Sequence, residues 1–316
     1  MNRVIRSIAF VVLSLSSAAV FAEFPNDRPI RVVTPYGAGG GIDVAARILS
    51  SIGEEHLGTR VDVVNMPGAG GLTAATFVRE AEPDGYTLLI SDYTPLVTLP
   101  LRESTPYSTD DWLPLVQVTE IAPTFVINAS TGYESLADVL QAAKQKPGAL
   151  AATHGTFMSS SHLPLLRLEQ NAGVTFNHVP TSGGGETFQF LLGNIVQLAV
   201  TTPATIIGPA RSGRVLPVAV ATANRISALP DTPTLRESGI DIVMPVWYTI
   251  FTTSEVPADR VRLLAERIVT AYASTEAQIL AKRAGLEIEP RGLEDTKQIY
   301  LQTIATVADT LSGLRE

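Results

Sequence analysis

The segment IRVVTPYGAGGGIDVAAR, residues 30–47, decides the fold that we expect for the whole chain. Its first apolar run stops at Pro35, as in a buried strand, and apolar side chains return from Val44 onward at the spacing of a helix. Glycines fill four of the five positions from 37 to 41, between these two patterns. The sequence therefore predicts a strand, a glycine loop and a helix that begins where the loop ends.

Such a loop is typical of an anion-binding site. The first amides of a helix lack partners within the helix and lie at the positive end of its dipole, and glycine lets a ligand approach the backbone. A dinucleotide fingerprint would need glycine where Ile42 stands, and a Walker loop would need a lysine that this loop lacks. Both phosphate motifs are weakened, and the structural alternative is a plain tight turn in which Asp43 favours the dipole.

The first third of the chain continues with the same alternation. Strands are expected at 30–35, 60–65 and 86–91, and helices at 42–57 and 71–82. This rhythm predicts a parallel sheet, whose strands end at the same edge. A second glycine loop at 65–71 and the polar pair Ser91 and Asp92 follow the second and third strands. We therefore expect three strand ends to converge on one crevice.

The remainder of the chain repeats this logic in a second series. Strands are expected at 124–129, 149–153, 174–179, 195–200, 215–221 and 247–252, and helices at 136–146, 162–171, 257–273, 276–284 and 293–313. The segment 110–120 is expected to be irregular. A hydroxyl-rich turn follows the strand at 149–153, and a third glycine cluster, 183–185, precedes another helix. Two α/β domains are expected for a chain of this length.

The amino terminus has the pattern of a secretory signal peptide. Arg3 and Arg6 precede an apolar core at 8–15, and small residues lead to Ala22, near which we expect cleavage. A net charge of −8 argues against a nucleic-acid partner. The chain has no cysteine, which excludes a disulfide framework and thiolate zinc sites.

The rival class is an exported hydrolase that uses a serine and a histidine. Ser159 and His162 lie close in sequence, but the chain has no Gly-x-Ser-x-Gly elbow. His154, His162 and His178 also lack a metal-binding spacing such as His-Glu-x-x-His. We therefore predict no catalytic residue, no metal site and no cofactor. An adhesion or assembly module, a third class, would leave the glycine loops without a role.

Several motifs resemble those of the Bug-type solute receptors, the extracytoplasmic proteins of tripartite tricarboxylate transporters. They are Arg28-Pro29-Ile30, residues 35–43, residues 65–71, Pro83-Asp84-Gly85-Tyr86-Thr87-Leu88-Leu89, Ser161-His162-Leu163 and residues 229–235. The resemblance runs from about residue 28 to the C-terminal helices. It implies a two-domain periplasmic binding protein clamp of type II-like architecture, each domain a mainly parallel sheet flanked by helices, with the ligand in the cleft between the domains. It also implies that carboxylates are held by backbone amides, hydroxyls and waters.

The sequence departs from the family pattern mostly in the second domain. Thr181 and Ser182 stand where the family usually has Tyr-Lys, and its common acidic positions are Gln197 and Thr201 here. Two further features leave alternatives open. Asp92 either accepts a hydrogen bond from a ligand amine or hydroxyl or caps a turn. Trp247 and Tyr248, which replace a usual Trp-Phe pair, either form an aromatic wall of the cleft or lie in the core.

These observations predict a periplasmic receptor that captures a small carboxylate, such as a dicarboxylate, and catalyses no reaction. Its partners are expected to be the ligand and the permease subunits of a tripartite tricarboxylate-type transporter, with the receptor itself a monomer. We expect one domain at 23–122 plus 252–316 and the other at 123–251. The predicted ligand-binding residues are Tyr36, Gly37, Ala38, Gly39, Gly40, Gly41, Asp43, Gly68, Ala69, Gly70, Ser91, Asp92, Thr156, Ser159, His162, Thr181, Thr201 and Trp247.

Overall fold

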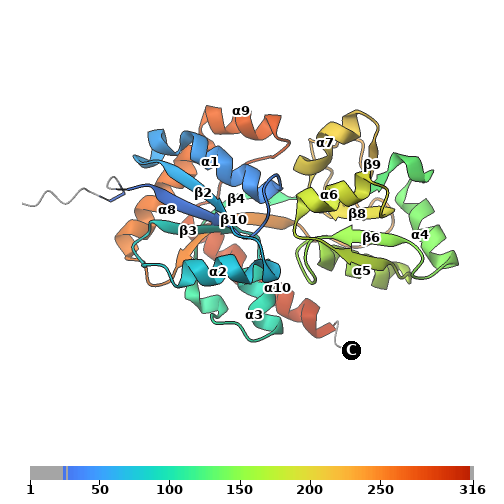
Figure 1. The fold of residues 1–316 in the computed structure, drawn as a ribbon, viewed down its shortest axis with the longest axis horizontal. Helices are drawn as coiled ribbons and strands as arrows, with labels where there is room; N and C mark the ends of the chain where they lie inside the picture. Colours follow the sequence, from blue (N-terminus) through green and yellow to red (C-terminus); the bar gives the residue numbers. More distant parts are fainter. Residues whose placement is uncertain (1–23, 26–27, 314–316) are drawn as a thin grey trace, which may run out of the picture.

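The computed structural model describes residues 24–25 and 28–313, which form two five-stranded sheets side by side along the long axis of the molecule (Figure 1). The expected signal peptide, residues 1–22, lies outside the described residues. Among the described residues, no helix is long and apolar enough to cross a membrane.

The first sheet is built around the opening strand of the sequence. Its strands lie in the order β2 (Val61–Asn65), β1 (Ile30–Thr34), β3 (Thr87–Ser91), β10 (Val246–Thr253) and β4 (Trp112–Ile121). β1 pairs in parallel with β2 and β3, whereas β10 runs antiparallel to both of its neighbours. The helices of this half are α1 (Gly41–Leu57), α2 (Leu72–Arg79), α3 (Leu99–Arg102), α8 (Ala258–Ala273), α9 (Thr275–Arg283) and α10 (Leu293–Gly313).

The second sheet repeats the same arrangement with other segments of the chain. Its strands lie in the order β7 (Asn177–Pro180), β6 (Ala151–His154), β8 (Leu198–Thr201), β5 (Thr124–Asn128) and β9 (Val215–Val220). The antiparallel strand, β5, again occupies the fourth position. Its helices are α4 (Leu136–Gln145), α5 (His162–Ala172), α6 (Gly184–Leu192) and α7 (Pro203–Arg211). The expected α/β class with mainly parallel sheets is confirmed, with one antiparallel strand in each sheet.

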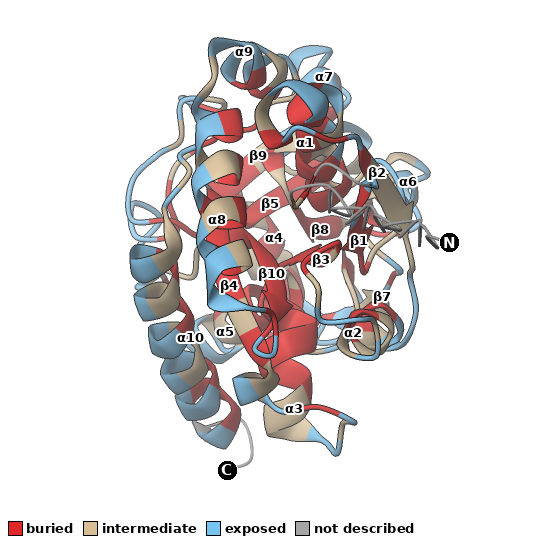
Figure 2. Cartoon of the chain, turned by 90° about the vertical axis from the view of Figure 1, so that its left-hand side faces the viewer, coloured by how far each residue is buried: buried red, intermediate tan, exposed pale blue. Residues whose placement is uncertain are grey.

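Strand β10 occupies a central place in the first half of the molecule. All eight of its residues are buried, and Figure 2 shows the strand deep among the other elements. It packs between β3 and β4, and its Phe251 side chain is completely buried. β10 is the last strand of this sheet along the chain, and it completes the core of the first half. The first sheet therefore depends on a segment that follows all strands of the second sheet in sequence.

Two sequence expectations need correction. The segment 110–120 is not irregular, because most of it forms β4. Pro114 and Gln117 interrupt its apolar pattern, and proline is tolerated here because β4 is an edge strand and its ladder with β10 is shifted near Pro114. The chain also returns to the first sheet before Val246, since β10 pairs there along its length, and not at 251 as expected.

Candidate functional site

A cavity of about 80 Å³ lies where strands of both sheets end. By this measure a single water needs roughly 10–15 Å³, so the cavity is large enough for a small organic molecule. Its lining comes from the segments that follow β1, β3, β6, β7 and β8 and from the ends of β4 and β10. This is the edge at which ligands bind in open α/β sheets.

Eight of the predicted ligand-binding residues line this cavity. They are Tyr36, Gly40, Gly41, Asp43, Asp92, Thr156, Ser159 and Thr201. The structure also places there residues outside the predicted set, namely Ile42, Ile121, Pro123, Gly155, Ser160, Ser161, Gly183, Gly184, Thr187, Val200, Thr202, Val246 and Tyr248. The predicted residues outside the lining are Gly37, Ala38, Gly39, Gly68, Ala69, Gly70, Ser91, His162, Thr181 and Trp247.

Four helices direct their amino termini at the cavity. The first residue or the capping residue of each helix is part of the lining: Gly41 for α1, Ser161 for α5, Gly184 for α6 and Thr202 for α7. Each helix contributes the positive end of its dipole, and α1 and α6 also offer amides without a partner within the helix. In α5 the amides of His162 and Leu163 are bonded to the Ser159 carbonyl oxygen and Pro164 has no amide hydrogen. No lysine or arginine of the described residues lines the cavity. The positive potential inside it therefore comes from backbone groups of both halves.

The two halves touch across this cavity. A Cβ added to Gly183 would lie 3.6 Å from the Cβ of Tyr36, and a Cβ added to Gly185 would lie 3.4 Å from the carbonyl oxygen of Ala38. The third glycine cluster thus packs on the first glycine loop. The Thr156 hydroxyl lines the cavity, is buried, and has no hydrogen-bond partner among the described residues. A buried hydroxyl without a partner is costly, so a ligand that bonds to it would restore that loss.

Asp92 joins the halves through a network that uses both of its carboxylate oxygens. One oxygen accepts from the Tyr36 hydroxyl at 2.9 Å and from the Thr94 amide at 2.9 Å, and the other accepts from the Ser160 hydroxyl. Ser160 also donates its amide to the Thr94 hydroxyl at 3.0 Å. Asp92 therefore caps the turn after β3 and binds the turn before α5.

The electrostatics of Asp92 follow from its burial. Burial raises the pKa of Asp92, and the hydrogen bonds from Ser160, Thr94 and Tyr36 lower it by less, so the net pKa lies above its usual value. Burial and the neighbouring Asp92 charge likewise raise the pKa of Tyr36. Folding therefore disfavours the charged form of the Asp92 carboxyl group, which lines the cavity.

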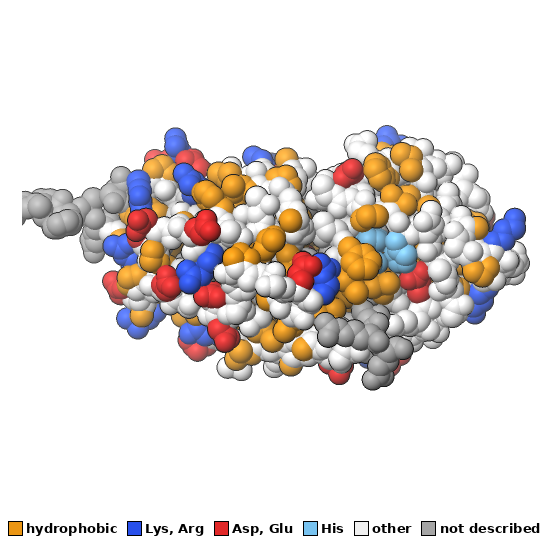
Figure 3. Space-filling model, turned by 60° about the horizontal axis from the view of Figure 1, so that its bottom comes forward, with side chains coloured by type: hydrophobic (Ala, Val, Ile, Leu, Met, Phe, Trp, Pro, Cys, Tyr) orange, Lys and Arg blue, Asp and Glu red, His pale blue; other side chains and the backbone are white. Residues whose placement is uncertain are grey.

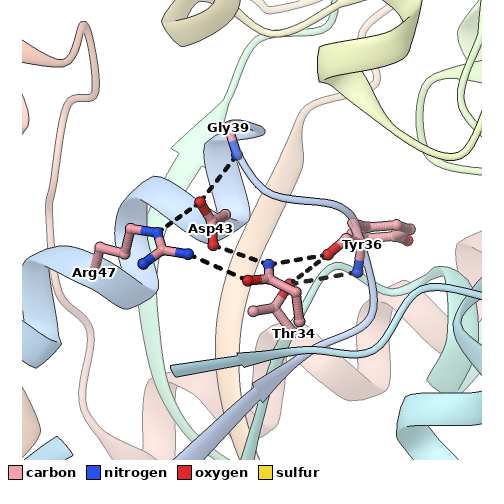
Figure 4. A network of polar contacts seen from close by, with 6 residues as sticks. Thr34, Tyr36, Gly39, Asp43 and Arg47 are labelled. Carbon is pink, nitrogen blue, oxygen red and sulfur yellow. Dashed lines mark hydrogen bonds and ion pairs between the residues drawn. The ribbon is translucent and has the colours of Figure 1, made fainter. Parts of the chain in front are cut away.

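Asp43 organises the first glycine loop from within, as Figure 4 shows. Its carboxylate accepts from the Gly39 amide at 2.9 Å, from the Arg47 guanidinium at 2.8 Å and from the Asn65 amide at 2.9 Å. Burial raises the pKa of Asp43, but these bonds lower it by more, so the net pKa lies below its usual value. The Gly39 amide is consequently occupied by Asp43, and the amides that remain for an anion lie further on, at the start of α1.

Replacement of Asp43 by asparagine is expected to lower the free energy of unfolding by about 1–2 kcal/mol at pH 7, since an amide cannot accept from all three donors. The folded-state pKa is lowered, so this stabilisation is present above the usual aspartate pKa of about 3.9 and is lost as the pH falls through the folded value. Urea unfolding at pH 7 and pH 3 measures both effects.

Asp62 supplies a matched control, because it pairs with Arg60 while 46% of its side chain is exposed. An Asp62→Asn change is expected to shift the unfolding free energy by less than about 0.5 kcal/mol. Equal effects of the two substitutions would remove the organising role of Asp43.

Trp247 points away from the cavity into the core of the first half. Its indole nitrogen donates to the Thr303 hydroxyl at 3.1 Å on α10, and its ring packs against Tyr93 and Phe251. The neighbouring Tyr248 faces the opposite side of the strand and lines the cavity. Of the two alternatives for Trp247, the structure therefore has the core position, and the aromatic wall is Tyr248.

Other predicted residues support the lining from behind. Thr181 donates to the His154 carbonyl at 2.8 Å, and His162 is enclosed among other histidines. In the second glycine loop, a Cβ added to Gly71 would lie 2.9 Å from the Pro95 side chain, and a Cβ added to Gly70 would lie 3.7 Å from the Thr156 hydroxyl oxygen. This loop, which includes Gly68 and Ala69, packs beneath the cavity and does not line it.

Comparison with known proteins places this geometry in context. Residues 45–307 match the family described as the tripartite tricarboxylate transporter family receptor. Protein BugT of Bordetella pertussis is 29% identical over 277 residues, which cover 85% of this chain and 85% of BugT.

Solved structures show the same architecture. The periplasmic binding protein BugD has a TM-score of 0.85 and 26% identity, with 91% of this chain and 97% of BugD covered. MatC from Rhodopseudomonas palustris with bound malate has a TM-score of 0.82 and 25% identity, covering 91% and 99%. The R. palustris protein Rpa4515 with adipate has a TM-score of 0.85 and 25% identity, covering 91% and 98%. These similarities confirm the periplasmic binding protein fold.

Proposed function

The chain belongs to the tripartite tricarboxylate transporter receptor family, and we propose that it is a periplasmic receptor that captures a small carboxylate for the permease subunits of such a transporter. This membership confirms the resemblance drawn from the motifs at 35–43 and 65–71. The observation that carries the proposal is the convergence of four helix amino termini, from both halves, on a cavity without a cationic side chain.

The groups that line this cavity are suited to a carboxylate. Carboxylates accept hydrogen bonds from amides and hydroxyls in the geometry that helix amino termini and threonine side chains offer. The cavity supplies the Gly41 end of α1 on one side and the Thr156, Ser159 and Thr201 hydroxyls on the other. The malate and adipate in the related MatC and Rpa4515 structures support the same ligand class.

The two sheets form the two lobes of a clamp in this proposal. The chain crosses between them at Ala122 and Pro123 and again between 221 and 245, and the ends of both crossings, Pro123 and Val246, line the cavity. Opening at these crossings would part the Asp92–Ser160 contact and expose the ligand. The receptor acts as a monomer, and its leader is removed near Ala22 on export.

The hydrolase alternative finds no support in the site, and the family is one of receptors. The Ser159 hydroxyl oxygen accepts a hydrogen bond from the backbone amide of His162 and lies 3.1 Å from the Ser161 hydroxyl oxygen. The His162 ring is engaged elsewhere, since its Nδ1 accepts from the Met158 amide and its Nε2 faces His178. Among the described residues, no histidine ring is therefore bonded to Ser159 as a general base would be.

A panel of carboxylates is expected to contain one compound that stabilises the protein clearly. Ligand that binds only the folded protein raises its stability by about 2.7 kcal/mol at a hundredfold excess over Kd. Thermal unfolding with malate, adipate, related dicarboxylates and monocarboxylates measures this effect, and chromogenic esters in parallel test for turnover. Stabilisation by a phosphorylated compound alone, with none from any carboxylate, would contradict the proposal.

A further inference from the structure

One wall of the cavity is apolar. Val246 begins β10 and pairs across the sheet with Ile121 at the end of β4, so both buried side chains lie on one face. From the second half, Pro123 directly precedes β5, and Val200 lies in β8, the strand with which β5 pairs. All four residues line the cavity, and none of their side chains has a polar atom. We call them the apolar wall.

The starts of α1 and α6 form one place at which amides are free for an anion. Neither helix has a side-chain cap, and the first amides of each lack partners within the helix. The two starts lie together, since a Cβ added to Gly185 would lie 3.4 Å from the carbonyl oxygen of Ala38, in the loop that leads into α1. The Tyr248 hydroxyl lies beside Gly41 at the same place. The two halves thus hold one anion between them.

The starts of α5 and α7 offer few amides by comparison. In α5 the amides of the first two residues are bonded to the Ser159 carbonyl oxygen at 2.9 Å, and the third residue is a proline. Helix α7 begins at Pro203, which has no amide hydrogen, and its Thr205 amide donates to the Thr202 carbonyl oxygen at 3.2 Å. A second carboxylate would therefore find at most one amide at each of these helices.

The serine and threonine hydroxyls of the lining do not replace the missing amides. The Thr201 hydroxyl is bonded to the Thr205 hydroxyl at 2.9 Å, and the Ser159 hydroxyl lies 3.1 Å from another serine hydroxyl. Among the lining residues that the structure describes, at most Thr156 and Thr202 have a buried hydroxyl without a hydrogen-bond partner. Two neutral donors do not offset the hydration that a second carboxylate loses on burial.

The cavity also has no positive charge to balance a second carboxylate. Of the described residues that line it, the charged ones are Asp43 and Asp92, both acidic. Arg47 bonds to Asp43 at 2.8 Å but is outside the lining. The lysine and arginine side chains seen in Figure 3 lie on the outer surface of the molecule. A dicarboxylate would therefore place a second, unpaired negative charge in a cavity that already contains acidic groups.

We propose that the ligand is a monocarboxylate with an apolar body, held with its carboxylate at the starts of α1 and α6 and its body against the apolar wall. This inference rests on the proposed function and narrows it from carboxylates in general to one class. The cavity of about 80 Å³ has room for roughly five to eight waters at 10–15 Å³ each. We therefore expect a ligand with about that many non-hydrogen atoms, such as a short branched fatty acid.

Matched pairs of ligands test the proposal on the mature chain freed of retained ligand. Isocaproate has the shape of succinate with one carboxylate replaced by an isopropyl group, and isovalerate is related to malonate in the same way. Calorimetric titration at pH 7 is expected to show that each branched monocarboxylate binds at least about tenfold more tightly than its dicarboxylate partner. Isocaproamide, which has no charge, should bind at least about tenfold more weakly than isocaproate.

Val246→Thr keeps the size of the side chain and places a hydroxyl in the apolar wall. It should weaken isocaproate binding at least about fivefold and leave succinate binding nearly unchanged. Val63→Thr is the matched control, because Val63 is a half-buried valine of the same sheet, in β2, outside the lining. It should leave both affinities unchanged. Circular dichroism of each variant verifies the fold.

Failure of this inference differs from failure of the proposed function. The monocarboxylate class is overturned if succinate or malonate binds as tightly as its branched partner, or if malate or adipate binds and neither monocarboxylate does. It is also overturned if Val246→Thr weakens succinate and isocaproate equally, because the body of the ligand then does not contact the apolar wall. Absence of binding by every carboxylate would instead contradict the receptor function itself.

Discussion

Replacement of Gly41 by alanine is expected to weaken carboxylate binding at least a hundredfold. A Cβ at this position would lie 2.5 Å from the Tyr248 hydroxyl oxygen and 3.0 Å from the nearest ring carbon, closer than real Cβ atoms approach. Tyr248 is 3% exposed and belongs to the fully buried strand β10, so its ring can move only into the cavity that it lines. Either the ring takes the space of the ligand or the amino terminus of α1 shifts. Two charge-assisted hydrogen bonds lost at about 1.5–3 kcal/mol each exceed a hundredfold in Kd.

Gly37→Ala is the matched control, because Gly37 lies in the same loop and an added Cβ meets nothing within 4 Å. It should bind within a few-fold of the parent. The double variant Gly41→Ala with Tyr248→Phe removes the closest oxygen and should recover part of the affinity. Calorimetric titration uses the carboxylate that stabilises the parent most. If Gly41→Ala binds as Gly37→Ala does, the start of α1 does not hold the anion.

The alternation of strands and helices from 30 to 91 could be predicted because each strand is a short, mostly apolar segment, interrupted by a charge only at Arg31 and Asp62. Strand β4 could not, since Pro114 and Gln117 break its pattern and only its place at the sheet edge makes them tolerable. The sheet to which β10 belongs was also beyond local analysis. A buried strand has the same pattern in either sheet, and its partners, β3 and β4, lie more than 100 residues earlier in the chain.

The cavity could be predicted where a residue ends a strand, as Thr201 does, or follows one within two positions, as Asp92 and Tyr36 do. It could not where the choice depends on which face of a strand points inward. Trp247 and Tyr248 alternate along β10, and the prediction selected Trp247 although Tyr248 lines the cavity. Glycine content was also a poor guide in the second loop, where Gly71 allows close packing on Pro35 and Pro95 and has no lining role.

Replacement of Asp92 by asparagine is expected to let the protein bind the carboxylate up to about a hundredfold more tightly at pH 7. This result is expected if Asp92 only caps a turn, and weaker binding is expected if Asp92 accepts a hydrogen bond from the ligand. The protein already supplies three donors to Asp92, from Tyr36, Thr94 and Ser160, so the carboxylate acts as a cap between the halves. Its charge opposes an anionic ligand. An anion in so small a cavity lies roughly 6 Å from the Asp92 carboxylate. At that separation two like charges repel by about 2.8 kcal/mol at an effective dielectric constant of 20.

The pH dependence of binding separates charge from shape at this position. The pKa of Asp92 is raised mainly by burial, so the parent carries less of the repelling charge below that pKa and more above it. Affinity of the parent should therefore fall as the pH rises through that pKa, and affinity of Asp92→Asn should stay nearly constant. Ser160→Ala is the control that removes one contact and keeps the charge, so it should retain the pH dependence. Calorimetric titration showing at least tenfold weaker binding by Asp92→Asn would mean that Asp92 accepts a hydrogen bond from an amine or hydroxyl of the ligand.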